Sequence, residues 1–327
     1  MGYGGGGGGG GSGGSGGSGG GGAAAGAVAA GISGGHGGTN AYKMKFMGNR
    51  GVFAGGAGPV DTIEYITIST PGNATDFAEL TSGRVYMNGG SNGYRGVFGG
   101  GAPSPPISDT IDYITISVLS DALDFGEISE ARFGYGTASS DTRCLFSSGY
   151  NGSTNIDSKE FITMNTLGSA IDFGDVTASR RYGIGTSDGE RGLFGSGYDG
   201  SSSLNLLEFI TFVSLGNARD FGDLTDAKFG KAALSDGVRG VFAGGPSSNI
   251  MAYVNINTAS NAKDFGDLLG TGNEDIVGCC NGYRGVFAGG YPPSNVMQYI
   301  QVSTLGNTLD FGDLTQARNA LAGISGD

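Results

Sequence analysis

The stretch Arg50-Gly51-Val52-Phe53-Ala54-Gly55-Gly56 decides the fold, because close copies of it follow along the chain. It places an arginine before a short apolar segment and a pair of small residues. The arginines that begin the six copies are spaced by 45, 48, 48, 48 and 45 residues, and they are Arg50, Arg95, Arg143, Arg191, Arg239 and Arg284. A fixed period of this length indicates one structural unit repeated six times.

Each unit contains four segments of strand-like composition separated by turn residues, which predicts a four-stranded antiparallel meander. For example, residues 178–186 lead through the turn Ser187-Asp188-Gly189 into a return strand that starts at Arg191, which predicts a hairpin. Residues 160–164 and 172–177 supply the other two kinds of strand. Four such strands fill the period and leave no room for a helix.

A small sheet with apolar side chains on both faces needs a neighbouring sheet on each side. Six sheets packed face to face around an axis predict an all-β fold, a six-bladed β-propeller. A linear solenoid is the alternative, but it would expose its end sheets, and the terminal units are as apolar as the inner ones. Residues 316–327 resemble the innermost strand of a further blade, so we expect them to complete the first blade and close the ring. Residues 41–48 are the alternative inner strand.

The first 39 residues are mostly glycine and serine with scattered alanine. The patterned sequence that follows is long enough to bury the core of one large repeat domain. We therefore expect a glycine-rich N-terminal arm over residues 1–40 and the propeller over residues 41–327. The tract at residues 4–22 has the composition of a flexible tether. The alternative is that it forms extended glycine helices that pack between chains or against a neighbouring protein.

The charge balance excludes several classes of partner. The net charge is -12 and lysine and arginine together number 18, so no basic stripe is present to bind nucleic acid or an anionic membrane surface. No run of 18 or more apolar residues exists, and the N-terminus lacks the pattern of a cleaved secretory signal, so we expect no membrane insertion. We expect Cys144, Cys279 and Cys280 to be reduced and packed within strands, with a vicinal disulfide between the last two as the alternative.

The repeats resemble the Kelch repeat, in which an arginine precedes an apolar strand that ends in a glycine pair, and an acidic-aromatic step and a large aromatic residue follow. Glycine pairs stand at residues 55–56, 100–101, 244–245 and 289–290. In the other two units serine replaces the first glycine, as Ser148-Gly149 and Ser196-Gly197. The acidic-aromatic steps are Glu64-Tyr65, Asp112-Tyr113, Glu160-Phe161 and Glu208-Phe209. The tryptophan of that family is absent, and smaller aromatic wedges stand in its place at Phe77, Phe125, Phe173, Phe221, Phe265 and Phe311.

The repeats are also similar to those of Kelch-like proteins carried by tailed phages of marine bacteria. The segments that carry this resemblance are Arg-Gly-Val-Phe-Ala-Gly-Gly and Tyr-Ile-Thr-Ile. This resemblance covers about residues 49–327. It implies a virion structural or tail-appendage protein, located on the particle and extracellular once the particle is assembled. It also implies that other virion proteins are partners, and the glycine-rich arm is the segment we expect to contact them.

The recurring Asp-Phe-Gly-Asp or related steps have the composition of a metal or acid-base site. A catalytic element occurs once, whereas these recur in every unit, so we interpret them as structural, with the aromatic ring packed inward and the aspartates bound to turn amides. A calcium site is the alternative. His36 is the only histidine and lies in the arm, which removes most imidazole chemistry. We expect no catalytic residue, no metal, no cofactor and no enzymatic activity.

The loops between the second and third strands are the longest and most varied part of each unit, and in a propeller they share one rim with the blade-to-blade connections. Tyr150, Tyr198 and Tyr291 each follow the small pair, and Asn151 and Asp199 come next to two of them. Exposed tyrosine beside asparagine and serine suits contact with a sugar or a protein. These five residues are the candidate binding residues, and ordinary solvated turns are the alternative.

These observations predict a non-enzymatic phage virion protein that decorates the particle or recognises a host-surface glycan or protein. The alternative is a cellular or secreted protein-binding scaffold of the ordinary Kelch kind. An enzyme that processes glycans with carboxylates alone is a third hypothesis, which release of sugar fragments from a surface polysaccharide would test.

Overall fold

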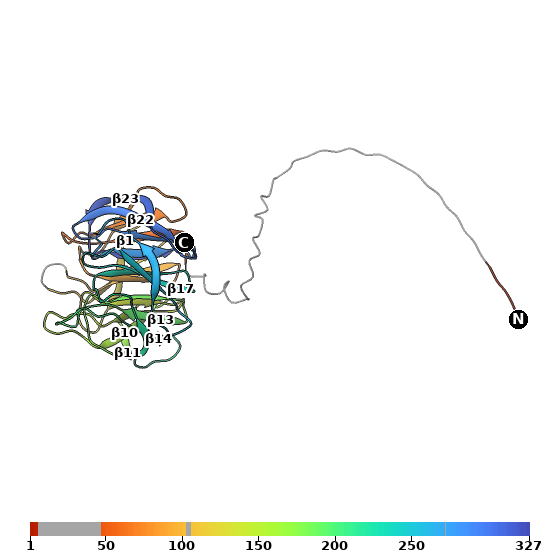
Figure 1. The fold of residues 1–327 in the computed structure, drawn as a ribbon, viewed down its shortest axis with the longest axis horizontal. Coiled ribbons are helices and arrows are strands. Elements are labelled where there is room, and N and C mark those ends of the chain that lie inside the picture. The colour runs from red at the N-terminus through yellow and green to blue at the C-terminus, as the bar shows by residue number, and fades with distance from the viewer. Residues whose placement is uncertain (6–46, 103–105, 272) are drawn as a thin grey trace. The chain divides into compact units, whose positions relative to one another are not determined.

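A six-bladed β-propeller forms the described part of the chain from Met47 onward (Figure 1). The computed structural model describes residues 1–5, 47–102, 106–271 and 273–327. The chain divides into two units, Met1–Gly37 and Gly38–Asp327, and the propeller lies in the second. It has six sheets of four antiparallel strands, and the described residues contain no helix. The predicted fold is confirmed, while the predicted boundary between residues 40 and 41 lies outside the described residues.

Each blade is a meander whose strands run outward from the axis. Blade 1 consists of β24 and β1–β3, and blades 2 to 6 follow as β4–β7, β8–β11, β12–β15, β16–β19 and β20–β23. The inner strands are β4 (Asn88–Ser91), β8 (Gly136–Ser139), β12 (Ile184–Ser187), β16 (Lys231–Ser235), β20 (Val277–Cys280) and β24 (Ala322–Gly326). The second strands are β1 (Arg50–Ala54), β5 (Arg95–Gly99), β9 (Arg143–Ser147), β13 (Arg191–Gly195), β17 (Arg239–Gly244) and β21 (Arg284–Ala288).

The two outer positions complete each blade. The third strands are β2 (Thr62–Thr67), β6 (Thr110–Thr115), β10 (Ser158–Thr163), β14 (Leu206–Thr211), β18 (Ile250–Asn255) and β22 (Ser294–Gln301). The outer strands are β3 (Thr75–Glu79), β7 (Leu123–Glu127), β11 (Ile171–Asp175), β15 (Arg219–Asp223), β19 (Lys263–Asp267) and β23 (Leu309–Arg318). Inner strands are shorter than the sequence predicts, because residues 178–183 and their counterparts form the blade-to-blade connections instead.

The C-terminal strand closes the ring, as predicted. β24 pairs antiparallel with β1, with Val52 opposite Ile324. It also contacts β20 and β4, the inner strands of the two neighbouring blades, so the inner strands form a continuous circle. The alternative that residues 41–48 form this inner strand is wrong, because β1 already has β24 and β2 as its two neighbours. Of that segment, residues 41–46 lie outside the described residues.

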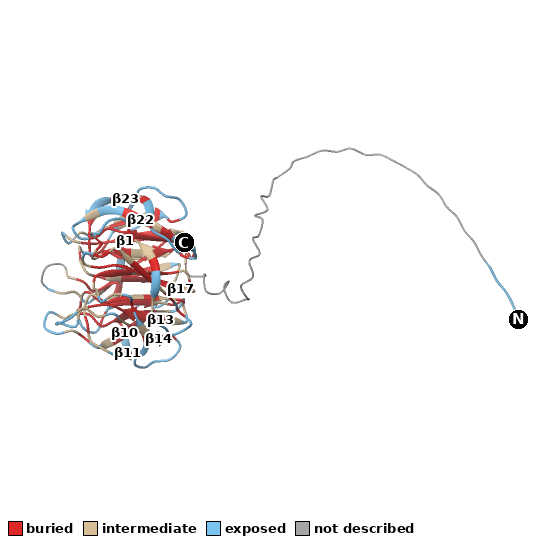
Figure 2. Ribbon diagram, in the orientation of Figure 1, coloured by how far each residue is buried: buried red, intermediate tan, exposed pale blue. Residues whose placement is uncertain are grey.

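Adjacent blades share buried apolar clusters, so both faces of each sheet are covered (Figure 2). A β-bulge between the third and outer strands leaves one residue unopposed in every blade. That residue is the repeat phenylalanine, which packs against the third strand of the next blade; Phe311 of blade 6, for example, shares a cluster with Ile66 of blade 1. The structure places these six rings between the blades: Phe77, Phe125, Phe173, Phe221, Phe265 and Phe311.

The repeat arginines join each blade to the next. Each guanidinium donates to a backbone carbonyl of the following blade, at 2.5–3.3 Å, in the pairs Arg50 to Ile116, Arg95 to Met164, Arg143 to Phe212, Arg191 to Ile256, Arg239 to Val302 and Arg284 to Ile68. Each also lies 4.4–5.2 Å from the centre of an aromatic ring on its own third strand. Because the last arginine donates to blade 1, this contact runs around the whole ring.

The residue after the bulged phenylalanine is glycine in five blades: Gly126, Gly174, Gly222, Gly266 and Gly312. Their φ angles lie between 131° and 145°, and an added Cβ would lie 2.4–2.6 Å from backbone of the next blade. The amide of the following acidic residue is bound as well; Asp175, for example, donates to Oδ1 of Asn217 at 2.9 Å. Among the described residues the side chains of Asp172 and Asp175 accept no hydrogen bond from a turn amide, and Asp175 is bound through its own amide instead, so the expectation that these aspartates bind turn amides is wrong.

Four blades bury an arginine-carboxylate pair beneath the rim that carries the second-to-third-strand loops. The arginine comes from the connection before the inner strand, and the carboxylate belongs to the acidic-aromatic step of the same blade. The pairs are Arg84 with Asp112, Arg132 with Glu160, Arg180 with Glu208, and Arg318 with Glu64. Burial lowers the pKa of the Arg318 guanidinium to about 10.

Both members of the pair change together in the other two blades. In blade 6 the positions hold Asn273 and Gln298, and Nε2 of the glutamine donates to Oδ1 of the asparagine at 3.2 Å. In blade 5 the carboxylate position is Ala252, and Lys228 stands in place of the arginine. The neutral blade 6 pair shows that the site requires matched partners rather than charge, since a lone buried charge would be costly.

Blade 3 buries a lysine where the other five blades bury an aliphatic side chain. Lys159 is fully buried at the position that Ile63 and Leu207 occupy in blades 1 and 4. Its Nζ donates to the backbone carbonyl of Asp175. Burial lowers the pKa of the amine to about 8, and the nearby Glu208 opposes that shift. The ammonium form is therefore destabilised in the fold at neutral pH.

Replacing Lys159 by methionine is expected to stabilise the propeller by about 1–3 kcal/mol at pH 7, because the cost of burying the charge disappears. The folded pKa lies below the unfolded value, so native stability falls as the pH drops from about 10.5 to about 8, and the full cost is present below that. The advantage of the variant should therefore shrink as the pH rises from about 8 toward 10.5. Urea unfolding at pH 7 and pH 9.5 measures the difference in free energy of unfolding between the variant and the native protein. The exposed Lys263→Met variant is the control. A constant advantage at both pH values would contradict this account.

Candidate functional site

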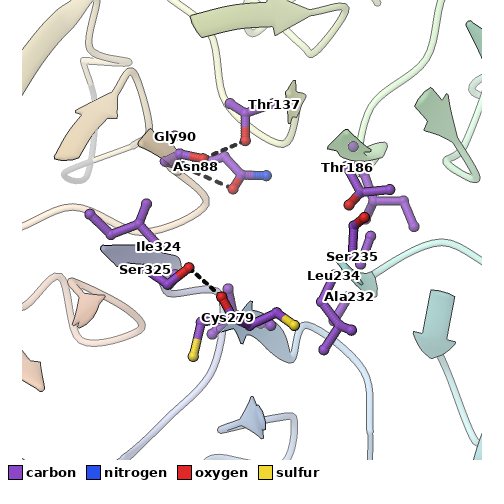
Figure 3. Close-up of a pocket in the computed structure, with 18 of the residues that line it drawn as sticks. Asn88, Gly90, Thr137, Thr186, Ala232, Leu234, Ser235, Cys279, Ile324 and Ser325 are labelled. Atoms are coloured by element: carbon purple, nitrogen blue, oxygen red, sulfur yellow. Dashed lines mark hydrogen bonds between the residues drawn. The ribbon is translucent and has the colours of Figure 1, made fainter. Parts of the chain in front are cut away.

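The six inner strands enclose a pocket of about 170 Å³ along the axis (Figure 3). Its lining is small and hydroxyl-rich, with Thr137, Thr186 and Ser235 among the residues drawn. Ser325 donates its hydroxyl to the carbonyl of Cys280 in the preceding blade, and Ser187 donates to Ser139 in the same way. These hydroxyls therefore serve mainly to join neighbouring inner strands.

At the rim end of the axis, one residue from each blade has a left-handed backbone with φ between 56° and 62°. These residues are Tyr86, Gly134, Tyr182, Gly230, Asp275 and Ala320. Five amide-to-carbonyl hydrogen bonds join them from blade to blade, as from Gly134 to Tyr86 at 2.9 Å and from Ala320 to Asp275 at 3.0 Å. The left-handed conformation costs about 1 kcal/mol or more for a non-glycine residue, and this ring of bonds holds it in place.

Large and small side chains alternate around this ring. Blades 2, 4 and 6 contribute Tyr86, Tyr182 and Asp275, whereas the blades between them contribute two glycines and an alanine. The two tyrosine rings lie 5.3 Å apart between centroids, and the Tyr86 hydroxyl donates to Oδ2 of Asp275 at 3.1 Å. Only about 60 Å³ remains open beside them. These three side chains, the axial plug, therefore fill the rim end of the axis.

Asp275 is the carboxylate of the axial plug, and its pKa is shifted upward. Burial raises its pKa from 3.8 to about 6, against the hydrogen bond from Tyr86, and the neighbouring Glu274 adds to the rise. Burial also raises the pKa of Tyr86, so this tyrosine remains a neutral donor. The carboxylate at the centre of the rim thus gains a proton more readily than an exposed aspartate.

Replacing Asp275 by asparagine is expected to stabilise the propeller by about 2–3 kcal/mol at pH 7. The folded pKa exceeds the unfolded value, so native stability is highest at low pH and is lost as the pH rises from about 4 to about 6. Asparagine keeps the size of the side chain and tolerates a left-handed backbone. Thermal unfolding at pH 4 and pH 7 checks this, because the difference should vanish at pH 4. The same gain at both pH values would refute the assignment to Asp275.

The rim itself is built from backbone bridges between each blade connection and the loop after the small pair. Phe133 and Tyr150 exchange both hydrogen bonds at 3.0–3.1 Å, and Arg181 and Tyr198 do so at 2.8–3.0 Å. The buried arginines support these loops from below, since Arg132 donates to the carbonyl of Ser148 and the carbonyl of Arg180 accepts from Gly149. The bridges place the two side chains of each pair next to each other on the rim.

Five flat side chains form a continuous row across blades 3, 4 and 5, which we call the planar row. Its members in spatial order are Phe133, Tyr150, Arg181, Tyr198 and Phe229. Successive groups lie 5.6, 4.8, 5.0 and 5.8 Å apart between ring centroids or from the guanidinium carbon to a centroid. All five are partly exposed, and Tyr182 of the axial plug contacts the row on its axial side. The row is a surface for contact rather than a buried core.

The structure brings together two of the five predicted binding residues. Tyr150 and Tyr198 lie on either side of Arg181, whereas Tyr291 is in blade 6, 55% exposed and paired through its amide with Glu274. Asn151 and Asp199 form their own turns, each accepting two backbone amides of the loop that follows. Sequence reasoning missed Phe133, Arg181 and Phe229, although all three occupy one position in successive repeats, at 48-residue steps.

The first described residue of the propeller, Met47, lies at the opposite axial end. Met47 lines the axial pocket beside Ser91 and Ser325, which stand at the far ends of their inner strands from the rim. The Asn49 amide donates to Oδ1 of Asp327, and the C-terminal end of the chain is marked there in Figure 1. Met47, the first described residue of the propeller, therefore lies at the axial end away from the planar row.

The described residues were also compared with the patterns of metal sites, membrane-spanning helices and disulfides. They hold no group of three or more histidine, cysteine or acidic side chains that could bind a metal ion. They also contain no apolar helix of membrane-spanning length. Cys144, Cys279 and Cys280 are free and buried in strands, so the vicinal disulfide is not formed. In comparisons with known proteins, no protein family and no curated protein matches this chain.

Proposed function

We propose that this protein is a non-enzymatic binding propeller, carried on a phage particle as a decoration or tail appendage. The observation that supports it best is the placement of the planar row and the connection at Met47 at opposite axial ends. Tyrosine and arginine carry much of the binding energy at recognition surfaces. A propeller tethered from one end would hold such a surface outward.

The assignment to a virion rests on the resemblance of the repeats to Kelch-like phage proteins. In this proposal the glycine-rich arm contacts other virion proteins, and the rim faces a host-surface glycan or protein outside the cell. The acidic net charge of -12 suits this role, because it disfavours non-specific contact with nucleic acid.

Selective labelling of the two axial ends tests the proposal. The three native cysteines are buried, so a single added cysteine can be modified with a maleimide polymer. Ser201→Cys places the polymer in an exposed rim loop, and Asp141→Cys places it in an exposed turn at the other end. Phage particles with the rim label should lose attachment to host cells, and those with the control label should keep it. Equal attachment of both would overturn the proposed role of the rim.

Mass spectrometry of purified particles separates this proposal from its alternative, a cellular or secreted protein-binding scaffold. The chain should be found in the particle at a fixed ratio to the other structural proteins. Its presence in infected cells but not in particles would favour the scaffold instead.

Asp275 of the axial plug and its neighbour Glu274 provide a direct test of enzymatic activity. Glu274 and Asp275 both have a raised pKa through burial and lie on the same face as the planar row. The proposal expects no release of sugar fragments from surface polysaccharide by either the native protein or its Asp275→Asn variant. Release by the native protein that is lost in this variant would establish a hydrolase.

A further inference from the structure

Arg181 differs from the other arginines of the chain in what its guanidinium contacts. Of the twelve arginines, six donate to carbonyls of the next blade and four pair with buried carboxylates. Arg219 is exposed on the outer strand β15. Arg181 alone lies within the planar row, and among the described residues no carboxylate pairs with it. A partly exposed cation without a carboxylate partner is an available site for an anion.

The stacking of Arg181 determines which of its atoms a ligand can reach. The guanidinium carbon lies over the rings of Tyr150 and Tyr198, 4.8 and 5.0 Å from their centroids, so cation–π contacts take up part of the surface of the group. Its N–H edge remains, with one long contact of 3.4 Å from Nη1 to Oδ1 of Asn155. An arginine edge of this kind matches a carboxylate in a bidentate geometry, and stacking between two rings fixes its orientation.

The aromatic side chains of the planar row determine which shape of ligand can bind beside Arg181. Rings from three adjacent blades lie in sequence, and in the described residues the hydroxyls of Tyr150 and Tyr198 make no hydrogen bond. Such a strip offers apolar ring surface for the C–H faces of sugar rings and free hydroxyls for sugar hydroxyls. Its length across blades 3 to 5 suits an extended chain rather than a compact small molecule.

We propose that the planar row binds an acidic glycan, with a sugar carboxylate on Arg181 and neighbouring sugar rings on Tyr150 and Tyr198. This inference rests on the proposed function and names its ligand class. One cation in the planar row of a chain with net charge -12 does not hold a densely charged polymer such as nucleic acid, which requires many cations. The planar row is better suited to a ligand that has one carboxylate and is otherwise neutral and rich in hydroxyl groups.

Binding of defined oligosaccharides to the full chain tests the proposal. The probes are trigalacturonate, a guluronate trimer and sialyllactose, with the methyl ester of trigalacturonate as a neutral match of the same shape. At least one acidic probe should bind, and its neutral ester should bind at least tenfold more weakly. NMR titration detects weak affinities and reports which tyrosines respond.

Substitutions in the planar row test which of its side chains contact the ligand. Arg181→Gln removes the charge but keeps a shorter polar side chain, and it should weaken binding at least tenfold. Tyr198→Ala should do the same, while Tyr291→Ala on the same rim should change nothing, and unchanged thermal unfolding excludes loss of fold. Failure of all three acidic probes, equal binding of acid and ester, or full binding by Arg181→Gln each overturns the proposal. If the rim label still blocks host attachment in that case, the proposed function stands with another ligand, such as a protein.

Discussion

Removing residues 316–327 is expected to abolish the folded propeller. The deletion takes away β24 and with it both the inner edge of blade 1 and the packing partner of β20 and β4. It also removes Arg318, which leaves the carboxylate of Glu64 buried without its partner. The combined loss exceeds the roughly 5–15 kcal/mol that stabilises a typical domain. Circular dichroism and size-exclusion chromatography should show an unfolded or aggregated chain.

A side-chain variant separates this effect from ordinary core damage. Ile324→Ala keeps the strand and its pairing with β1 but empties part of a buried cluster, so it should cost about 2–5 kcal/mol with the fold retained. A synthetic peptide of residues 316–327, added to the truncated chain during refolding, should restore the propeller. A truncated chain that unfolds cooperatively at the native temperature would contradict the closing role of β24.

The second large effect is expected from the buried pair of blade 4. Glu208→Ala should destabilise the propeller by about 3–5 kcal/mol, because Arg180 loses its partner at 2.7 Å and stays buried. Glu208 also accepts hydrogen bonds from the amide and hydroxyl of Thr177, at 2.7 and 2.6 Å, which disappear as well. Chemical denaturation at pH 7 measures the loss.

The neutral pair of blade 6 supplies a matched control. The double variant Arg180→Asn with Glu208→Gln copies Asn273 and Gln298, in which the glutamine oxygen accepts from the Leu269 amide and the Thr308 hydroxyl. It should recover more than half of the stability that Glu208→Ala loses, because no charge remains buried alone. If the double variant is as unstable as the single one, shape rather than charge matching decides the site.

Much of the fold could be predicted from the sequence because the information is periodic. The spacing of the arginines fixes the number of blades, and the missing inner strand of the first unit is matched by the surplus segment at residues 316–327. Apolar residues on both faces of each unit then require neighbours on both sides. None of these inferences needs the position of an individual side chain.

The site could be predicted only in part, because it depends on which neighbour each side chain meets. Tyr150, Tyr198 and Tyr291 have the same offset in their repeats, yet only the first two lie beside an arginine. Arg180 and Arg181 are adjacent in sequence, but one side chain is buried against Glu208 and the other lies on the rim. The left-handed backbone at Tyr182 that follows them is not apparent from composition. The plug residues were missed for the same reason.

The closure of blade 1 has a mechanical consequence for a tethered protein. A force applied at Asn49 and directed away from the rim would act along β1, whose hydrogen bonds to β2 and β24 both lie at right angles to the pull. All of these hydrogen bonds are loaded in shear at once instead of being unzipped one by one. The pairing of β24 with β1, which closes the ring, is thus also well arranged to resist a force applied to the N-terminal end of β1.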